Sequence, residues 1–147
     1  MDKGIYCLVL ATAGTTVRTG ALGEIVFPEG WYVYVGSALG TGGLKRLDRH
    51  VTLFRDRNKS PKWHIDHLLL DPGFTLEYTV SAATGYDLEC LLAQRIGEQG
   101  IRGFGCSDCS CTTHLFFRER DPKKEIITAF KRLMLAPAIQ TINTRGV

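Results

Sequence analysis

Residues 4–11 read GIYCLVLA and residues 31–36 read WYVYVG, and these two stretches decide the fold. Both are rich in β-branched, aromatic and other apolar side chains and are bounded by glycines, which is the composition of β-strands. Alternate side chains of a strand share a face, so pairing of the two strands would bring Tyr6 and Tyr34 to one side of a sheet. The sequence therefore predicts a pair of strands that present two tyrosines together.

The other elements follow from residue periodicity and from turn residues. Further strands are expected at 15–20, 23–27, 74–83 and 114–117, and helices from about 44, over 62–70, over 87–99 and over 122–136. The apolar side chains that recur at helical spacing are expected to face the core: Leu44, Leu47, Val51, Leu88, Leu91, Leu92, Ile96, Ile126, Ile127, Phe130, Leu133 and Met134. Pro137 ends the last helix, and the final ten residues are expected to be loosely held. Strands followed by helices around one or two more strands indicate a single α+β domain over residues 1–147.

The composition is that of a soluble globular protein. The 147 residues are 44% hydrophobic and 22% charged, which suits one domain with its own core. No apolar run reaches the roughly 20 residues that cross a bilayer, and the N-terminal stretch lacks a convincing processing region. Five cysteines, an odd number with three close together, do not match a secreted disulfide framework. We therefore expect a cytoplasmic protein without membrane association.

Basic side chains concentrate in residues 45–62. Seven Lys and Arg residues face only two Asp residues there, which gives the segment a net charge of +5 and, because the whole chain carries +3, leaves −2 for the remainder. The seven are Lys45, Arg46, Arg49, Arg55, Arg57, Lys59 and Lys62. Such a patch can neutralise phosphates and release counterions, which favours a nucleic-acid partner. The alternative is a solvated helix and loop that happen to be basic.

Two tripeptides and three later polar residues stand in a characteristic order. GIY at 4–6 is followed by YVG at 34–36, then by Arg46 and His50 in KRLDRH, and by Glu89 at the start of a later helix. This order resembles the GIY-YIG nuclease superfamily, with Val in place of the second Ile, over about two thirds of the chain. The stretches GWYVYVGSALG, WHIDHLL and GFGCSDCSC with HLF resemble a compact archaeal and bacterial branch of it, which in some archaea is joined to an endonuclease III-type glycosylase.

The resemblance implies a small, mainly antiparallel sheet flanked by helices. The catalytic core would span about 4–100, followed by a cysteine-rich loop and a C-terminal helix in 101–147. It also implies Mg²⁺- or Mn²⁺-dependent cleavage of DNA in repair or processing, with DNA and a repair protein such as a DNA glycosylase as partners. The implied catalytic side chains are Glu89 for the metal, Arg46 for the phosphate, and Tyr6, Tyr34 and His50 for water. Substrate contacts are expected from Gly36, Ser37, Lys45, Arg49 and His64.

The chemistry of these side chains suits phosphodiester hydrolysis. Mg²⁺ commonly takes one or two carboxylates and keeps several waters, as Glu89 would allow. Arg46 can grip two phosphate oxygens, and His50, four residues later, is its neighbour on one helical face. Gly36 would leave room for a phosphate backbone. Three features depart from the family pattern: a wider gap between the tripeptides, extra glycines in GTGG, and Ser37 where some relatives carry Lys.

Two other functions remain open. A DNA-binding or repair-accessory module would keep the fold but hydrolyse poorly, which the absent Lys and the altered spacing favour. A zinc-stabilised interaction domain would centre on the pattern C-x2-C-x-C-x2-H, formed by Cys106, Cys109, Cys111 and His114. These ligand types suit zinc, but four ligands within nine residues rarely close a tetrahedron. The alternative there is a glycine-rich loop with buried thiols beside the substrate groove.

Overall fold

The computed structural model describes residues 2–101, 103–104 and 113–143, and it confirms a single α+β domain. The strands are β1 (Gly4–Thr12), β2 (Thr15–Arg18), β3 (Glu24–Phe27), β4 (Gly30–Ala38), β5 (Phe74–Ala83), β6 (Leu115–Arg118) and β7 (Ala138–Thr141). The helices are α1 (Lys45–Asp56), α2 (His64–Leu70), α3 (Glu89–Ile96) and α4 (Lys123–Arg132), with a short 3₁₀ helix at Gly20–Leu22. Among the described residues, none of these helices has the length and apolar character to cross a membrane.

β1 is the central strand of a five-stranded sheet with the order β6-β4-β1-β5-β7. Each neighbouring pair in this sheet is antiparallel, as expected. The register of β1 with β4 places Tyr6 opposite Gly36 and Leu8 opposite Tyr34. Because directly opposite residues share a face of the sheet, Tyr6 and Tyr34 lie on the same side, which confirms the prediction from alternation.

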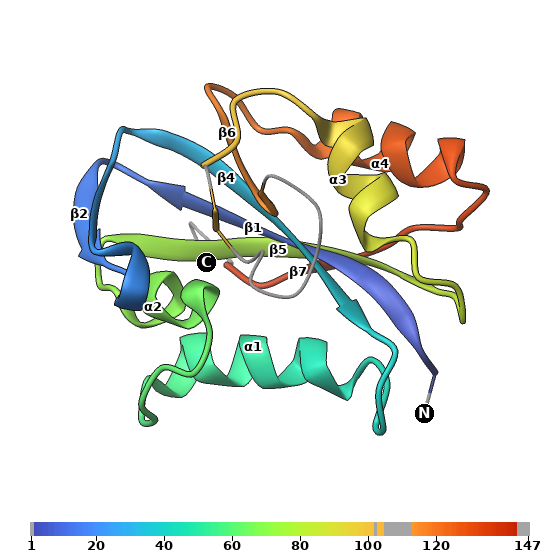
Figure 1. Ribbon diagram of the computed structural model, residues 1–147, viewed down its shortest axis with the longest axis horizontal. Coiled ribbons are helices and arrows are strands. Elements are labelled where there is room, and N and C mark those ends of the chain that lie inside the picture. Colours follow the sequence, from blue (N-terminus) through green and yellow to red (C-terminus); the bar gives the residue numbers. More distant parts are fainter. Residues whose placement is uncertain (1, 102, 105–112, 144–147) are drawn as a thin grey trace.

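Helices cover both faces of this sheet (Figure 1). α1 and α2 lie on one face, over the core that contains Tyr6 and Leu8. α3 and α4 lie on the other face, over the core that contains Ile5 and Cys7. All four side chains are at most 2% exposed. β1 is therefore buried on both faces, which is why its sequence is a continuous apolar run.

β2 and β3 form a separate two-stranded hairpin beside the main sheet. The sequence predicts two short strands here within a meander, and the strands are confirmed, although they pair with each other instead of extending the main sheet. Val17 and Phe27 turn inward and are buried. The ring centroid of Phe27 lies 5.3 Å from that of Tyr32 and 5.2 Å from that of Phe74, both edge-on. The enlarged segment between the first two motifs thus extends the core on the α1–α2 face.

The last helix is shorter than its periodicity predicts. α4 ends at Arg132, and Met134 adopts a φ of 62°, which is incompatible with a right-handed helix. Met134 is 92% exposed, so its predicted place in the core is wrong, whereas Phe130 is fully buried as expected. Leu91 on α3 is also exposed, because Leu92 beside it makes the contact with the sheet.

β7 is a strand that the sequence analysis does not predict. Its residues pair with β5, and the amide of Ile142 just beyond it donates to the carbonyl oxygen of Glu77 at 2.9 Å. The expectation that the last ten residues are loosely held is therefore wrong for 138–143. All four residues of β7 are exposed, so no apolar alternation marks the strand. Backbone hydrogen bonds to β5 hold it instead.

Candidate active site

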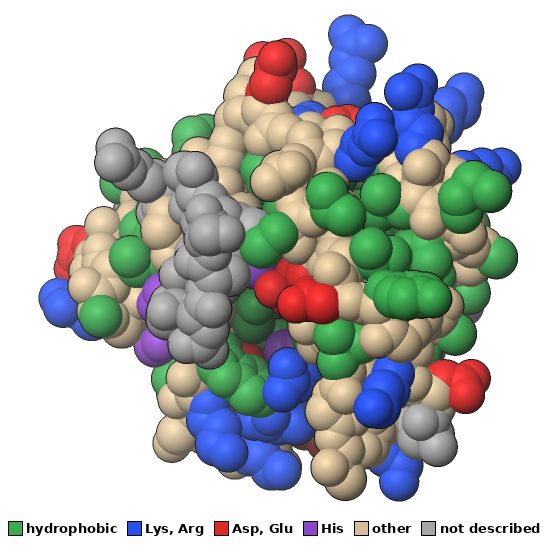
Figure 2. Space-filling view, turned by 45° about the vertical axis from the view of Figure 1, so that its right-hand side comes forward, with side chains coloured by type: hydrophobic (Ala, Val, Ile, Leu, Met, Phe, Trp, Pro, Cys, Tyr) green, Lys and Arg blue, Asp and Glu red, His purple; other side chains and the backbone are tan. Residues whose placement is uncertain are grey.

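A cavity of about 370 Å³ lies among β1, β4, α1, α2 and α3. It is lined by all five side chains that the sequence analysis proposes for catalysis: Tyr6 from β1, Tyr34 from β4, Arg46 and His50 from α1, and Glu89 from α3. We term it the Tyr6 cavity. The face of the molecule drawn in Figure 2 is hollowed, with acidic side chains on one rim and Lys and Arg side chains on the other. The fold thus brings residues of four separate elements to one concave site.

The innermost contact of the cavity joins Tyr6 and His50. The hydroxyl oxygen of Tyr6 and Nε2 of His50 are 2.8 Å apart, and both side chains are 2% exposed. His50 points inward because it lies on the buried face of α1 together with Leu47 and Val51. The ring of Tyr34 meets that of His50 edge-on, with 6.4 Å between centroids. Two tyrosines and one histidine therefore form a contiguous cluster.

Gly36 provides the space that the ring of Tyr6 occupies. A Cβ at Gly36 would lie 2.5 Å from Cζ of Tyr6 and 2.6 Å from its hydroxyl oxygen. The sequence analysis expects this space to admit a phosphate backbone. The structure gives Gly36 a different role, since the phenol ring already fills the space and sets where its hydroxyl lies.

A buried carboxylate faces the other side of His50. Oδ1 of Asp66 lies 3.9 Å from Nδ1 of His50, and Oδ2 of Asp66 accepts hydrogen bonds from two backbone amides at the start of α2, at 2.8 and 3.2 Å. Burial lowers the pKa of His50 from 6.5 to about 4. The charge of Asp66 raises this pKa, and the charges of two nearby arginines lower it. His50 is therefore neutral at pH 7. When the proton of the neutral ring is on Nδ1, which faces Asp66, Nε2 accepts a hydrogen bond from the hydroxyl of Tyr6.

The hydroxyl of Tyr6 holds its proton firmly. Burial raises its pKa well above the usual value of 10.0. The neighbouring Tyr34 raises the pKa further, Arg46 lowers it, and Glu89 and Asp66 raise it. Tyr6 is accordingly a hydrogen-bond donor to His50 at neutral pH, and the protein by itself does not stabilise a tyrosinate here.

Arg46 is held at the wall of the cavity by two contacts. Its Nη1 donates to the carbonyl oxygen of Ser37 at 3.1 Å, and its guanidinium carbon lies 5.2 Å from the ring centroid of Trp63. The guanidinium carbon of Arg49 lies 4.3 Å from the same centroid, and His50 packs edge-on against the ring at 5.9 Å. Cation–π attraction therefore positions both arginines beside the cavity. The longer loop before α1 does not remove Arg46 from the site.

Glu89 begins α3, with its side chain 21% exposed. Its Oε1 lies 3.5 Å from Nδ1 of His114, and Nε2 of His114 lies 3.9 Å from the sulfur of Cys90, which is disulfide-bonded. Burial lowers the pKa of His114, and Glu89 acts in the opposite direction. His114 therefore packs against the carboxylate of Glu89 at the wall of the cavity.

The five predicted substrate contacts fall into three groups. Ser37 and His64 line the Tyr6 cavity, and Gly36 lies behind Tyr6. Lys45 and Arg49 do not line it; they border an adjacent cavity of about 330 Å³, next to the loop at 40–43. We term this second space the glycine cavity. Arg46 belongs to both cavities and forms their shared wall.

Several residues that line the Tyr6 cavity were not predicted from the sequence to belong to the active site. The other side chains that line the Tyr6 cavity are Leu39, Lys62, Trp63, Asp87, Cys90 and His114. Lys62 carries one usable signal, its place in the basic segment. Asp66 has no local signal, because its contact with His50 forms only when α2 packs against α1.

The proposed zinc cluster is mostly beyond the described residues. Cys106, Cys109 and Cys111 lie outside them, and His114, the fourth proposed ligand, pairs with Glu89. Within the described part of the chain, no three His, Cys, Asp or Glu side chains are grouped so that they could hold a metal ion.

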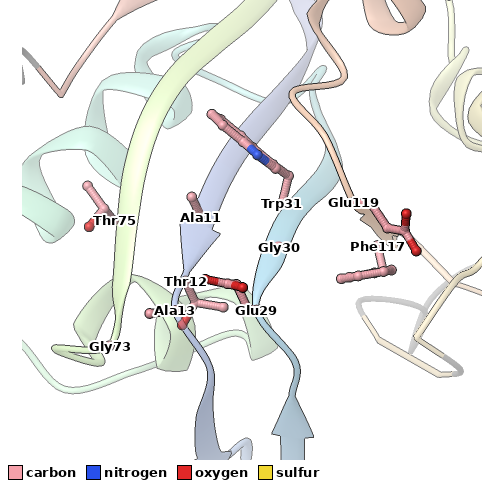
Figure 3. A pocket seen from close by; sticks show the side chains of 10 residues that line it. All are labelled: Ala11, Thr12, Ala13, Glu29, Gly30, Trp31, Gly73, Thr75, Phe117 and Glu119. Carbon is pink, nitrogen blue, oxygen red and sulfur yellow. The ribbon is translucent and has the colours of Figure 1, made fainter.

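A larger cavity of about 730 Å³ lies at the opposite ends of β1 and β4 (Figure 3). Its floor is made of small residues, and Trp31, Phe117, Glu29 and Glu119 stand around it. Its lining contains no Lys, Arg, His or Cys among the described residues. Two carboxylates with no cation in the described part of the lining would repel phosphate, so the size of a cavity alone does not identify the site, and the Tyr6 cavity is the better candidate.

Comparison with known proteins places the chain in a family. A search of curated proteins returned no match, and neither did a search of solved structures. Residues 5–135 match the family described as "Domain of unknown function DUF123". The matched span includes every residue that lines the Tyr6 cavity. The chain therefore belongs to the DUF123 family.

Proposed function

We propose that this protein is a divalent-metal-dependent endonuclease that hydrolyses DNA phosphodiester bonds with the site chemistry of the GIY-YIG nucleases. The observation that carries the proposal is the Tyr6 cavity itself. Five side chains picked by motif order line one space of about 370 Å³, although they come from four elements. A phenol, an imidazole, a guanidinium and a carboxylate together can move a proton, bind a phosphate and hold a metal.

Tyr6 and His50 provide a route for the proton of the attacking water. His50 is neutral at pH 7, and its Nε2 lies 2.8 Å from the hydroxyl oxygen of Tyr6. Tyr6 can pass its own proton to Nε2 while it takes one from water, so no free tyrosinate has to form. Asp66, facing Nδ1, stabilises the imidazolium that results. The histidine is then the terminal base and the tyrosine its extension into the cavity.

Arg46 and Lys62 are the cations that would receive the phosphate. The planar guanidinium of Arg46 can bind two phosphate oxygens at once, and its contacts with Ser37 and Trp63 hold it in place. Lys62 lines the same cavity from the segment before α2. It supplies an amine to the site although Ser37 stands where some relatives carry Lys. The altered motif is therefore a weaker argument for a non-catalytic module than the sequence suggests.

Glu89 is the residue that would hold a divalent metal ion. Its carboxylate lines the cavity, Asp87 contributes a second carboxylate to the lining, and Nδ1 of His114 lies 3.5 Å from Oε1 of Glu89. Oxygen donors in this small number fit Mg²⁺ or Mn²⁺, which keep several water ligands, better than they fit zinc. The bound ion would supply positive charge to a phosphate oxygen and lower the pKa of a water molecule.

Cleavage assays test the proposal. Purified protein is incubated with duplex, flap and branched DNA in Mg²⁺ or Mn²⁺, alongside Glu89→Ala and Tyr6→Phe. We expect cleavage by the wild type and a loss of about a hundredfold or more in each variant, because one removes the metal ligand and the other the proton relay. Glu119→Ala removes a carboxylate from the larger cavity and serves as the matched control, with unchanged activity.

Binding without cleavage, unaffected by Glu89→Ala, would contradict the proposal. That result would favour the second candidate, a DNA-binding or repair-accessory module with the same fold. A place in DNA repair, and a partner such as a DNA glycosylase, are part of the proposal, and a pull-down with purified glycosylase on damaged duplex DNA tests them.

A further inference from the structure

The glycine cavity is a basic space with an open backbone floor. Its lining contains three cations, Lys45, Arg46 and Arg49, and no acidic side chain among the described residues. A Cβ placed at Gly40 or Gly42 would meet no atom within 4 Å, so the peptide groups there are unscreened by side chains. Such a combination suits an anion with several oxygen atoms.

The attraction for an anion comes from the basic side chains and the loop at 40–43, and not from the N-terminus of α1. The amides of Gly43, Lys45, Arg46 and Leu47 already donate to backbone carbonyls at 3.0–3.2 Å, and the amide of Leu44 donates at 2.7 Å. The first turn of α1 therefore has its donors engaged. All three cations line the cavity, and the guanidinium carbon of Arg49 lies 4.3 Å from the ring centroid of Trp63.

Arg46 connects this space to the proposed active site. It lines both the Tyr6 cavity and the glycine cavity, and its bond to the carbonyl oxygen of Ser37 fixes it between them. An anion in the glycine cavity would thus be one arginine away from a phosphate in the Tyr6 cavity. Two anion sites that share a guanidinium match successive phosphates of one strand better than two unrelated ligands.

We propose that the glycine cavity binds the DNA phosphate that neighbours the scissile one on the same strand. The inference rests on the proposed function, which it deepens by adding a second phosphate subsite. The GTGG loop is then a binding element, because its residues line the cavity that the phosphate occupies. Lys45 and Arg49 neutralise this neighbouring phosphate, while Arg46 serves both.

Equilibrium binding in EDTA tests the subsite without any cleavage. Fluorescent single-stranded and duplex oligonucleotides are titrated with wild type, Lys45→Ala and Gly40→Asp over a range of salt concentrations. Loss of one phosphate contact reduces the slope of log K against log salt by about one, which corresponds to about tenfold weaker binding at 0.1 M salt. Gly40→Asp should weaken binding at least as much, and its backbone is unstrained because Gly40 has no left-handed φ.

Matched variants separate the subsite from a diffuse basic field. Lys124→Ala removes an exposed charge from α4, on the other face of the sheet, and Ala21→Asp adds a carboxylate between β2 and β3; neither residue lines the glycine cavity. We expect both to bind nearly as the wild type does. Equal losses in a cavity variant and in its control would overturn the inference. Binding of inorganic phosphate that Gly40→Asp abolishes, with oligonucleotide affinity unchanged, would also overturn it, because the cavity would then serve a free anion.

A single uncharged methylphosphonate linkage, moved along the oligonucleotide, locates the contact. The loss caused by Lys45→Ala should disappear when the neutral linkage occupies one position and persist at the others. If the loss depends on the position of the neutral linkage but the protein cleaves no DNA, the phosphate subsite stands and the proposed nuclease activity is refuted. Cleavage by a protein whose cavity variants equal their controls would refute the subsite alone.

Discussion

The close approach of Gly36 and Tyr6 leads to a prediction about stability and geometry together. In Gly36→Ala, the new Cβ would lie 2.5–2.7 Å from three atoms of the Tyr6 side chain, whereas non-bonded carbon atoms normally stay about 3.5–4.0 Å apart. The ring must therefore move by about 1 Å. Such a shift breaks the 2.8 Å contact with His50, because hydrogen bonds of this kind extend to only about 3.2 Å.

The cost combines overpacking with the lost hydrogen bond. Overpacking of a buried core costs about 1–3 kcal/mol, and a lost buried hydrogen bond adds about 1 kcal/mol. With a urea dependence of about 2 kcal/mol per molar for a domain of this size, the unfolding midpoint should fall by roughly 1–2 M. Equilibrium urea denaturation followed by circular dichroism measures it. Gly40→Ala is the matched control, since its Cβ meets nothing, and its midpoint should not move.

A double-mutant cycle decides whether the ring of Tyr6 is the cause. In a Tyr6→Leu background the branched side chain ends short of the clash, so Gly36→Ala should cost less than about 1 kcal/mol. An equal penalty in both backgrounds would refute the reasoning, because the strain would then lie in the strand backbone and not against the ring.

Three further predictions concern stability. Burial holds the pKa of His50 at about 4, against 6.5 in the unfolded chain, so the unfolded chain binds more protons between these two pH values. The free energy of unfolding should therefore be at its full value above about pH 6.5 and fall by roughly 3 kcal/mol toward pH 4. The urea midpoint of His50→Gln should vary less than that of the wild type across this range. Ile142→Ala should cost about 2 kcal/mol because the residue is 8% exposed, whereas Ile139→Ala at 42% exposure should cost little. Equal thermal shifts would show that the side chain of Ile142 does not help to hold the segment 138–143 against β5. Met134→Gly should raise the melting temperature by relieving about 1 kcal/mol of left-handed strain, and Met134→Ala should not, since alanine keeps the Cβ.

Elements with a periodic apolar pattern could be predicted from sequence, and those without one could not. β1 and β4 were predicted because their residues favour strands and their alternation sets which side chains share a face. β7 escaped prediction because its four side chains are exposed and its stability comes from pairing with β5. Met134 follows the helical spacing of α4 in sequence, yet the chain turns into the left-handed region there, and spacing carries no information about where a helix stops.

The sequence by itself determined the α+β class, the shared face of Tyr6 and Tyr34, and the set of five polar residues at the candidate site. The first two depend on local chemistry, namely apolar periodicity and alternation within a strand, and the third rests on a resemblance in the order of motifs. Only the tertiary structure decided that the Tyr6 ring fills the space above Gly36, that Asp66 backs His50, and that Arg46 joins two cavities. These contacts join residues of different elements, and their energies exist only after the helices have packed onto the sheet.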